Sequence, residues 1–156
     1  MTALNSTDLR SQICVPRNER LIVALDVADA AEARALVEQL GDSVQFYKVG
    51  MELFMAGGYF ELIDWLGARG KKVFVDLKFF DVPETVRSAI RALAKRNVAF
   101  ATIHGNQAIM EAAGKEKGNL KVLAVTALTS LDRGDLDDLG FDCDIEQLVL
   151  SRARRA

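Results

Sequence analysis

The sequence predicts an α/β fold in which the strands of a parallel sheet alternate with helices along the chain. Five short, mostly apolar runs indicate strands that start at residues 21, 45, 72, 98 and 121. Each run is followed by apolar residues spaced three and four apart, the pattern of a helix that packs on one face. The runs recur at a spacing of roughly 25 residues, which suits a strand and the crossover helix that leads to a parallel neighbour.

The first predicted unit illustrates the pattern. Residues 21–26 are apolar up to Asp26, as expected of a strand that is buried on both faces of a parallel sheet. Asp29 and Glu32 have the spacing of a helix capping box. The apolar stripe that follows ends at Gly41, a residue that can close a helix.

Four further units follow the same plan. Their helices are expected around apolar stripes that include Leu62, Ile90 and Ile109, and a last helix is expected after Asp144. Parallel strands joined in this way form either an open doubly wound sheet or a (β/α)₈ barrel. The strands of these four units are predicted over residues 45–49, 72–77, 98–103 and 121–126.

The stretch from residue 72 to residue 85 carries an unusual set of charges. Asp76 and Lys78 lie near the end of an apolar strand and face the same side, because side chains alternate along a strand. Burying an acid and a base there is costly without a partner or a task. Asp81 and Glu84 have the spacing of a second capping box. Taken singly, Asp81 could be an N-cap, and Asp76 with Lys78 could be a structural ion pair.

Polar residues recur where the predicted strands end, and this favours the barrel. A barrel gathers catalytic groups from the carboxyl ends of several strands at one mouth, and no Gly-x-Gly-x-x-Gly dinucleotide signature follows the first strand. We therefore expect a (β/α)₈ TIM barrel that is incomplete, with about five of its eight βα units. It would span residues 21–156, after a polar leader over residues 1–20. The polar residues concerned are Asp26, Lys48, Asp76, Lys78, His104, Thr126 and Thr129.

Composition and charge argue against several classes of function. The chain has 20 basic and 22 acidic residues, a balance that gives no support for a nucleic-acid or membrane partner. No apolar run has the length of a transmembrane helix or the form of a signal peptide. One histidine and two distant cysteines, Cys14 and Cys143, argue against a zinc site and favour a cytoplasmic setting. The acidic residues Asp132, Asp135, Asp137 and Asp138 are expected to lie in a solvated loop. A metal site there is the weaker alternative, because a calcium loop needs a stricter spacing.

Four motifs give the sequence a resemblance to a known family. They are Leu25-Asp26, Lys48-Val49-Gly50, the block Asp-Leu-Lys-Phe-Phe-Asp-Val-Pro-Glu-Thr over residues 76–85, and Thr-Ala-Leu-Thr-Ser over residues 126–130. With them the chain resembles the orotidine 5′-phosphate decarboxylases over nearly all residues from Leu21 onward. The Asp-x-Lys-x-x-Asp-Val-Pro part is the most specific of these motifs. Phe80 stands where the family more commonly has histidine.

The resemblance implies a decarboxylation of orotidine 5′-monophosphate to uridine 5′-monophosphate, without metal or organic cofactor, in a homodimer. It implies that Lys78 protonates C6 of the ring, while Asp76 lies near the departing carboxylate. Lys48 and Asp26 would hold the ribose hydroxyls, and Asp81 would reach the active site of the neighbouring subunit. His104 would lie near the site without a leading chemical role. The implied catalytic residues are Lys48, Asp76, Lys78 and Asp81, and the implied substrate-binding set adds Asp26, Val82, Thr85 and Thr129.

Two alternatives stay open from the sequence. Hexulose-6-phosphate synthases and 3-keto-gulonate-6-phosphate decarboxylases share the Asp-x-Lys-x-x-Asp pattern, but they use magnesium and carry an acid near the position of Lys48. Lys48 therefore favours the orotidylate reaction. The orotidine 5′-phosphate decarboxylases also bind the substrate phosphate through loops that follow the late strands of the barrel. No such strands are predicted in this sequence. The second alternative is thus a truncated, non-catalytic half-barrel that serves as an interaction module.

Overall fold

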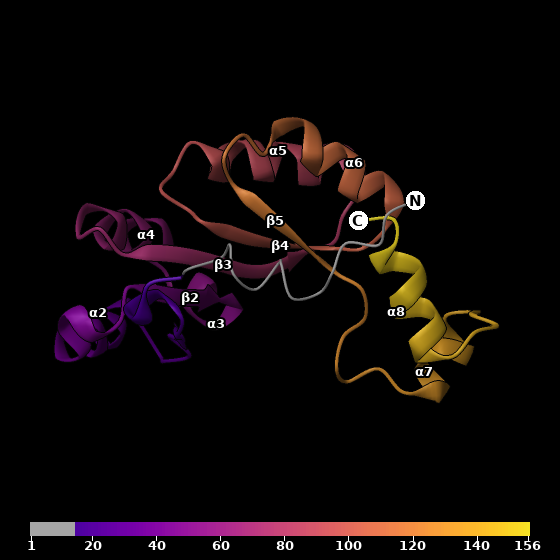
Figure 1. Ribbon diagram of the computed structural model, residues 1–156, viewed down its shortest axis with the longest axis horizontal. Helices are drawn as coiled ribbons and strands as arrows, with labels where there is room; N and C mark the ends of the chain where they lie inside the picture. The colour runs from indigo at the N-terminus through magenta and orange to yellow at the C-terminus, as the bar shows by residue number, and fades with distance from the viewer. Residues whose placement is uncertain (1–14) are drawn as a thin grey trace, which may run out of the picture.

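A computed structural model of the chain describes residues 15–156, which form a twisted parallel sheet with helices beside it (Figure 1). The strands pair in the order in which they occur along the chain, and every pair is parallel. This confirms the α/β class and the five predicted βα units. The strands are β1 (Ile22–Ala24), β2 (Phe46–Gly50), β3 (Lys72–Phe79), β4 (Phe100–His104) and β5 (Lys121–Val125).

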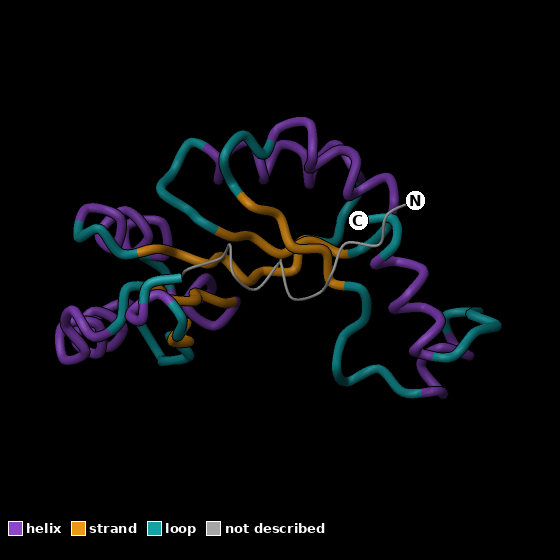
Figure 2. The backbone as a smooth tube through the Cα atoms, in the orientation of Figure 1, coloured by secondary structure: helices purple, strands orange, loops and turns teal. Residues whose placement is uncertain are grey.

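Helices alternate with the strands along the whole described chain (Figure 2). Figure 1 shows α5 and α6 lying over one face of the sheet, whereas α7 and α8 lie to one side of it, beyond the end of β5. Over residues 15–156, no helix combines the length and the apolar character needed to cross a membrane. The helices are η1 (Arg17–Glu19), α2 (Ala30–Leu40), η2 (Gly41–Ser43), α3 (Met51–Ala56), α4 (Tyr59–Ala68), α5 (Pro83–Ala94), α6 (Gln107–Glu116), α7 (Arg133–Asp138) and α8 (Ile145–Ala153).

The first predicted helix has the caps that its sequence indicates, with one difference. The Asp29 carboxylate accepts the backbone N–H groups of Ala31 and Glu32, at 2.8 and 2.9 Å, and therefore caps α2. Gly41 closes the helix with a φ of 53° and a ψ of −129°, a positive-φ conformation that glycine adopts without steric cost. The Glu32 carboxylate accepts the N–H of Ala28 instead of that of Asp29, so the capping box is not reciprocal.

Two of the sequence predictions about caps and loops are wrong. Asp81 does not cap α5: Val82 occupies the N-cap position, and no side chain caps that helix end. The acidic residues 132–138 are not a loop, because residues 133–138 form α7 and Asp132 is its N-cap. Its first turn is closed by a reciprocal capping box in which Asp132 and Asp135 each accept the backbone N–H of the other, at 3.0 and 2.9 Å.

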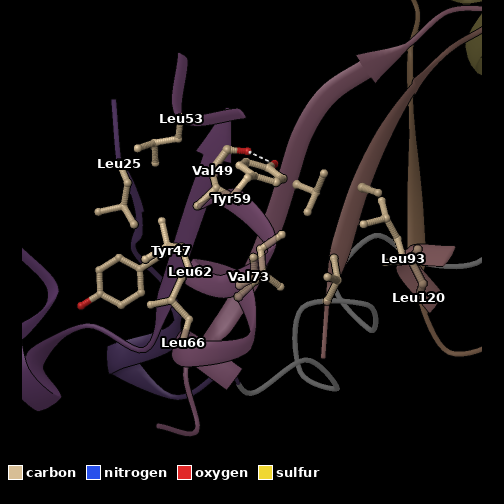
Figure 3. Close-up of a cluster of buried hydrophobic side chains, with 14 of the residues drawn as sticks. Leu25, Tyr47, Val49, Leu53, Tyr59, Leu62, Leu66, Val73, Leu93 and Leu120 are labelled. Carbon is tan, nitrogen blue, oxygen red and sulfur yellow. Dashed lines mark hydrogen bonds between the residues drawn. The ribbon is translucent and has the colours of Figure 1, made fainter. Parts of the chain in front are cut away.

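The main core lies between the sheet and the helices packed on it (Figure 3). Outward-facing strand residues such as Tyr47, Val73 and Ile103 are fully or almost fully buried against the helical stripes. Within this core the Tyr59 hydroxyl donates a 3.1 Å hydrogen bond to the carbonyl of Val49. Burial, together with a smaller contribution from the negative charge of Asp76, raises the pKa of Tyr59, so its hydroxyl remains a donor at neutral pH.

The opposite face of the sheet changes character along the strands. Near their amino ends it carries three phenylalanines, with Phe100 stacked on Phe46 and in edge contact with Phe74 at centroid distances of 5.3 and 6.0 Å. Near their carboxyl ends the same face carries polar side chains, among them Lys48 and Asp76. Because side chains repeat every two residues, a shift of two positions along a strand moves from an aromatic layer to a charged one.

Lys71 stabilises the junction between α2 and the sheet, and this gives a testable prediction. Its side chain is 6% exposed, and its ammonium donates to the carbonyls of Gly41 and Val44 at 2.7 and 3.1 Å. Lys71→Met is expected to lower the free energy of unfolding by about 2–4 kcal/mol, because two buried carbonyls lose their donor. Urea unfolding followed by circular dichroism measures the change.

The matched control for this prediction is Asp42→Ala. The Asp42 carboxylate lies 3.5 Å from the same ammonium but is fully exposed, so its removal should leave the unfolding midpoint almost unchanged. Equal destabilisation by the two substitutions would show that the ion pair, rather than the pair of carbonyl contacts, is what matters at this junction.

Candidate functional site

Charged side chains from three strands meet at the carboxyl edge of the sheet. Lys48 on β2 is paired in register with Phe74, so its side chain lies diagonally from Asp76, two residues further along β3. The Lys48 ammonium lies 3.3 Å from Asp26, which follows β1, and 3.6 Å from Asp76. The Lys78 ammonium lies 3.0 Å from the other oxygen of Asp76. Four residues predicted from the sequence are thus brought into one cluster, and we call it the charged cluster.

Lys78 owes its position to an irregularity in β3. Pairing with β4 runs regularly to Val75, opposite Ala101, and resumes at Phe79, opposite Ile103, so three residues of β3 face one of β4. Lys78 has a φ of 48°. This left-handed conformation costs a residue with a side chain about 1–2 kcal/mol. Strain of this kind is found where the surrounding structure enforces it, often at functional positions.

The charged cluster holds Asp76 in its ionised form. Burial alone would raise the pKa of Asp76, whose side chain is 13% exposed. Hydrogen bonds from Lys78 and Thr102, and the positive charges of Lys78 and Lys48, outweigh burial and lower that pKa below its ordinary value. The site therefore presents a fixed carboxylate next to two ammonium groups at neutral pH.

A cleft of about 330 Å³ opens above the charged cluster. Its lining combines charged side chains with apolar ones, a combination typical of a site for a small polar ligand. Lys78 is 42% exposed, so its ammonium is accessible from the cleft. The lining residues are Asp26, Lys48, Gly50, Met51, Asp76, Leu77, Lys78, His104 and Leu128.

His104 lines the cleft but is poorly suited to donate a proton. Burial, followed by the positive charges of Arg152 and Lys78, lowers the pKa of His104 below its ordinary value. The imidazole is therefore neutral at pH 7. Its ring stacks on Phe80 with centroids 4.5 Å apart, which gives it a packing role at the end of β4.

The other predicted site residues lie outside the charged cluster. The Asp81 carboxylate is exposed and accepts a hydrogen bond from the adjacent N–H of Val82, at 2.7 Å. Val82 is also exposed. Thr85 borders a second, largely apolar cavity of about 490 Å³, which adjoins the cleft because Met51, Leu77 and Lys78 line both. Thr129 lies exposed in the turn after β5, and Leu128 beside it lines the cleft instead.

Thr102 belongs to the site, although the sequence analysis did not single it out. It is 6% exposed, and its hydroxyl lies 2.9 Å both from the backbone nitrogen of Lys78 and from the Asp76 carboxylate. A signal was available, because Thr102 is a polar residue within an apolar strand and lies two positions before His104, hence on the same face.

The chemistry that this arrangement can perform follows from its charges. Lys78 is an accessible ammonium held by a carboxylate, so it can donate a proton to a ligand atom in the cleft and stabilise negative charge there. Lys48 already lies between Asp26 and Asp76, with its ammonium 3.3 and 3.6 Å from the two carboxylates. Among residues 15–156, no group of three histidine, cysteine, aspartate or glutamate side chains is placed to hold a metal ion.

Comparison with protein-family models identifies a family for this chain. The model described as the "Orotidine 5′-phosphate decarboxylase / HUMPS family" matches residues 19–156. The chain is 68% identical over 142 residues to an orotidine 5′-phosphate decarboxylase of Methylococcus capsulatus, with 91% of the chain and 59% of the relative covered. It is 46% identical over 158 residues to the Nitrobacter winogradskyi protein of the same name, with 100% of the chain and 62% of the relative covered. The chain thus spans about three fifths of the length of these relatives.

Solved structures show the same relationship. An orotidine 5′-phosphate decarboxylase from Lactobacillus acidophilus superposes with a TM-score of 0.80 at 34% identity, covering 86% of this chain and 65% of that one. A Methanocaldococcus jannaschii orotidine 5′-monophosphate decarboxylase, complexed with the inhibitor BMP, superposes with a TM-score of 0.70 at 26% identity, covering 87% and 61%. These neighbours support the predicted incomplete barrel.

Proposed function

Because the chain belongs to the orotidine 5′-phosphate decarboxylase / HUMPS family, we propose that it carries the charged centre of an enzyme that converts orotidine 5′-monophosphate to uridine 5′-monophosphate. The observation that carries the proposal is the Lys78 ammonium, which lies 3.0 Å from the Asp76 carboxylate at the cleft. A reaction that leaves negative charge on a ring carbon needs a cation and a proton donor at that point.

The proposed step uses these two residues directly. Cleavage of the bond between C6 and the carboxylate releases carbon dioxide and leaves an electron pair on C6. The Lys78 ammonium stabilises this charge and then transfers its proton, so that a C6–H bond forms and a neutral amine remains. Asp76 lies beside Lys78 and near the departing carboxylate. Because the cluster is already in place before the substrate reacts, little reorganisation is needed when the charge develops.

Lys48 and Asp26 complete the proposed substrate contacts. Their side chains lie 3.3 Å apart at the edge of the cleft, with one donor and one acceptor available for the ribose hydroxyls. Lys48 also favours decarboxylation of orotidylate over the magnesium-dependent reactions of the superfamily. The hexulose-6-phosphate synthases and 3-keto-gulonate-6-phosphate decarboxylases carry an acid near this position, whereas this chain carries an ammonium. We propose that the reaction proceeds without a cofactor.

We further propose that the active enzyme is a homodimer in which Asp81 serves the neighbouring site. Asp81 is exposed and lies outside the charged cluster of its own chain. It is flanked by Phe80 and Val82, which are 65% and 64% exposed, and Met51 and Phe54 add further exposed apolar surface at the 490 Å³ cavity. Apolar surface of this kind around a polar residue is typical of a protein interface. Val82, Thr85 and Thr129 remain proposed substrate contacts.

We also propose that the protein acts in the cytoplasm and that its chain divides into a leader over residues 1–20 and a barrel domain over residues 21–156. Residues 1–14 lie outside the described part of the chain. At the end of the proposed leader, the Glu19 carboxylate lies 2.6 Å from the Lys72 ammonium on β3, so this part packs on the amino end of the sheet.

A spectrophotometric assay of purified protein tests the proposed function. It is applied to the 156-residue chain and to a chimera that adds the part of the Methylococcus capsulatus relative lying outside the match. We expect the chimera to convert orotidine 5′-monophosphate, with the same rate in excess EDTA, and the chain alone to show little or no activity. Binding energy from parts of the substrate remote from the reacting atoms is often needed to assemble such a site.

Other results would favour the alternatives. A rate that EDTA abolishes and magnesium restores would support the phosphosugar enzymes of the superfamily. A folded chimera with no decarboxylase activity, together with concentration-dependent association of the chain, would support the non-catalytic interaction module.

A further inference from the structure

We propose that Thr102 is a positioning residue whose hydroxyl ties the Asp76 carboxylate to the backbone of Lys78 and so fixes the position of the Lys78 ammonium. The inference rests on the proposed function of this site. It adds a residue of β4 to the residues that position the proton donor. It is carried by the two 2.9 Å contacts of the Thr102 hydroxyl, by its burial, and by the irregular pairing of β3.

The direction of each hydrogen bond is set by the donors available. The backbone N–H of Lys78 can only donate, so the Thr102 oxygen must accept from it. The single hydroxyl proton is then free for Asp76, whose ionised carboxylate can only accept. The chain of donors therefore runs from the Lys78 backbone through Thr102 to Asp76.

This chain of hydrogen bonds closes on the residue where it begins. The Asp76 oxygen that accepts from Thr102 also accepts from the Lys78 ammonium, at 3.0 Å. The other oxygen of Asp76 faces Lys48 at 3.6 Å. The backbone and the side chain of Lys78 are thus both held on one carboxylate oxygen, and Thr102 supplies the backbone half of this attachment.

The irregular pairing explains why a hydroxyl is needed at this position. The three residues of β3 from Asp76 to Lys78 stand opposite Thr102 alone, so the regular ladder is interrupted there. The Lys78 N–H takes the side chain of Thr102 as its acceptor. Without the hydroxyl, both this N–H and an acceptor position on Asp76 would be left unsatisfied in a largely buried place.

Substitution at Thr102 tests the inference in two ways. Thr102→Val removes the hydroxyl and keeps the shape of the side chain. Thr102→Ala removes the hydroxyl and leaves a smaller side chain. Thr102→Ser keeps the hydroxyl. Carboxyl-detected NMR titration of the 156-residue chain should show a raised Asp76 pKa in the Val and Ala variants and a pKa near the original in the Ser variant. In the active chimera, kcat should fall by up to about 100-fold in the first two variants, with little change in KM, because a proton donor displaced by about 1 Å reacts far more slowly.

These measurements test the positioning role of Thr102 separately from the proposed decarboxylase function. An unchanged Asp76 pKa in both hydroxyl-free variants, or a Ser variant that fails to restore kcat, would overturn the positioning role. If the Val variant does not fold, the Ala variant is judged by the same criteria. A chimera that is inactive with Thr102 intact would refute the proposed function. The pKa shift in the chain would then still establish that Thr102 fixes Asp76.

Discussion

Lys78→Ala is expected to lower the decarboxylation rate of the active chimera by about 10⁴-fold or more. The estimate combines the loss of a proton donor, worth roughly 10²–10⁴-fold, with the loss of the positive charge that stabilises the carbanion, worth roughly 10²–10³-fold. Substrate binding should weaken much less, because Lys48 remains in place between Asp26 and Asp76. Steady-state kinetics over a range of substrate concentrations separates the two effects.

The control for this experiment is Lys95→Ala, which removes an exposed lysine next to the end of α5, away from the cleft. It should leave kcat and KM unchanged. Circular dichroism of both variants establishes that they fold alike, since alanine at residue 78 must still adopt the left-handed backbone. A Lys78→Ala enzyme within tenfold of the unmodified rate would rule out Lys78 as the proton donor.

Asp81→Ala should abolish most of the activity, and mixing should restore it in a diagnostic way. If each site combines Lys78 of one subunit with Asp81 of the other, a dimer of one Lys78→Ala chain and one Asp81→Ala chain has one fully intact site. Random mixing makes half of the dimers mixed, so roughly a quarter of the activity should return. The rate is measured after the two inactive proteins are unfolded and refolded together.

The same mixture distinguishes a shared site from a self-contained one. If Asp81 acts on the Lys78 of its own chain, every site in the mixture carries one defect and no activity returns. Native mass spectrometry confirms that mixed dimers have formed. The matched control mixes Lys78→Ala with Asp76→Ala, two defects in the same part of one site, and should show no rescue.

The sequence predicts the strands well because their signal is local. Each predicted start lies within two residues of the observed one, since an apolar run can be read without knowing what it packs against. Lys48, Asp76 and Lys78 were found for a related reason. Charges in buried strands are rare, and parallel pairing forces strand ends to share one edge.

The failed prediction for Asp81 and the features that were not predicted depend on contacts between distant parts of the chain or on competition between neighbouring residues. Asp81 has the spacing of a cap, but α5 begins at Pro83 and takes Val82 as its N-cap instead. Helix α3 begins directly after β2, so no loop residues separate the two elements in the sequence and mark the start of the helix. The left-handed backbone of Lys78 depends on the register of β3 against β4, which no local pattern encodes.

The sheet order β1-β2-β3-β4-β5 has a consequence for how the chain is made. Every strand pairs with the one synthesised just before it, so each βα unit can dock as soon as it leaves the ribosome. The loop-closure entropy lost when two strands pair is small at each step, because no strand must wait for a partner that lies far away in the sequence. During translation the newest strand is therefore always the growing edge of the sheet and covers the edge of the strand before it, whereas the outer edge of β1 stays unpaired among the five described strands.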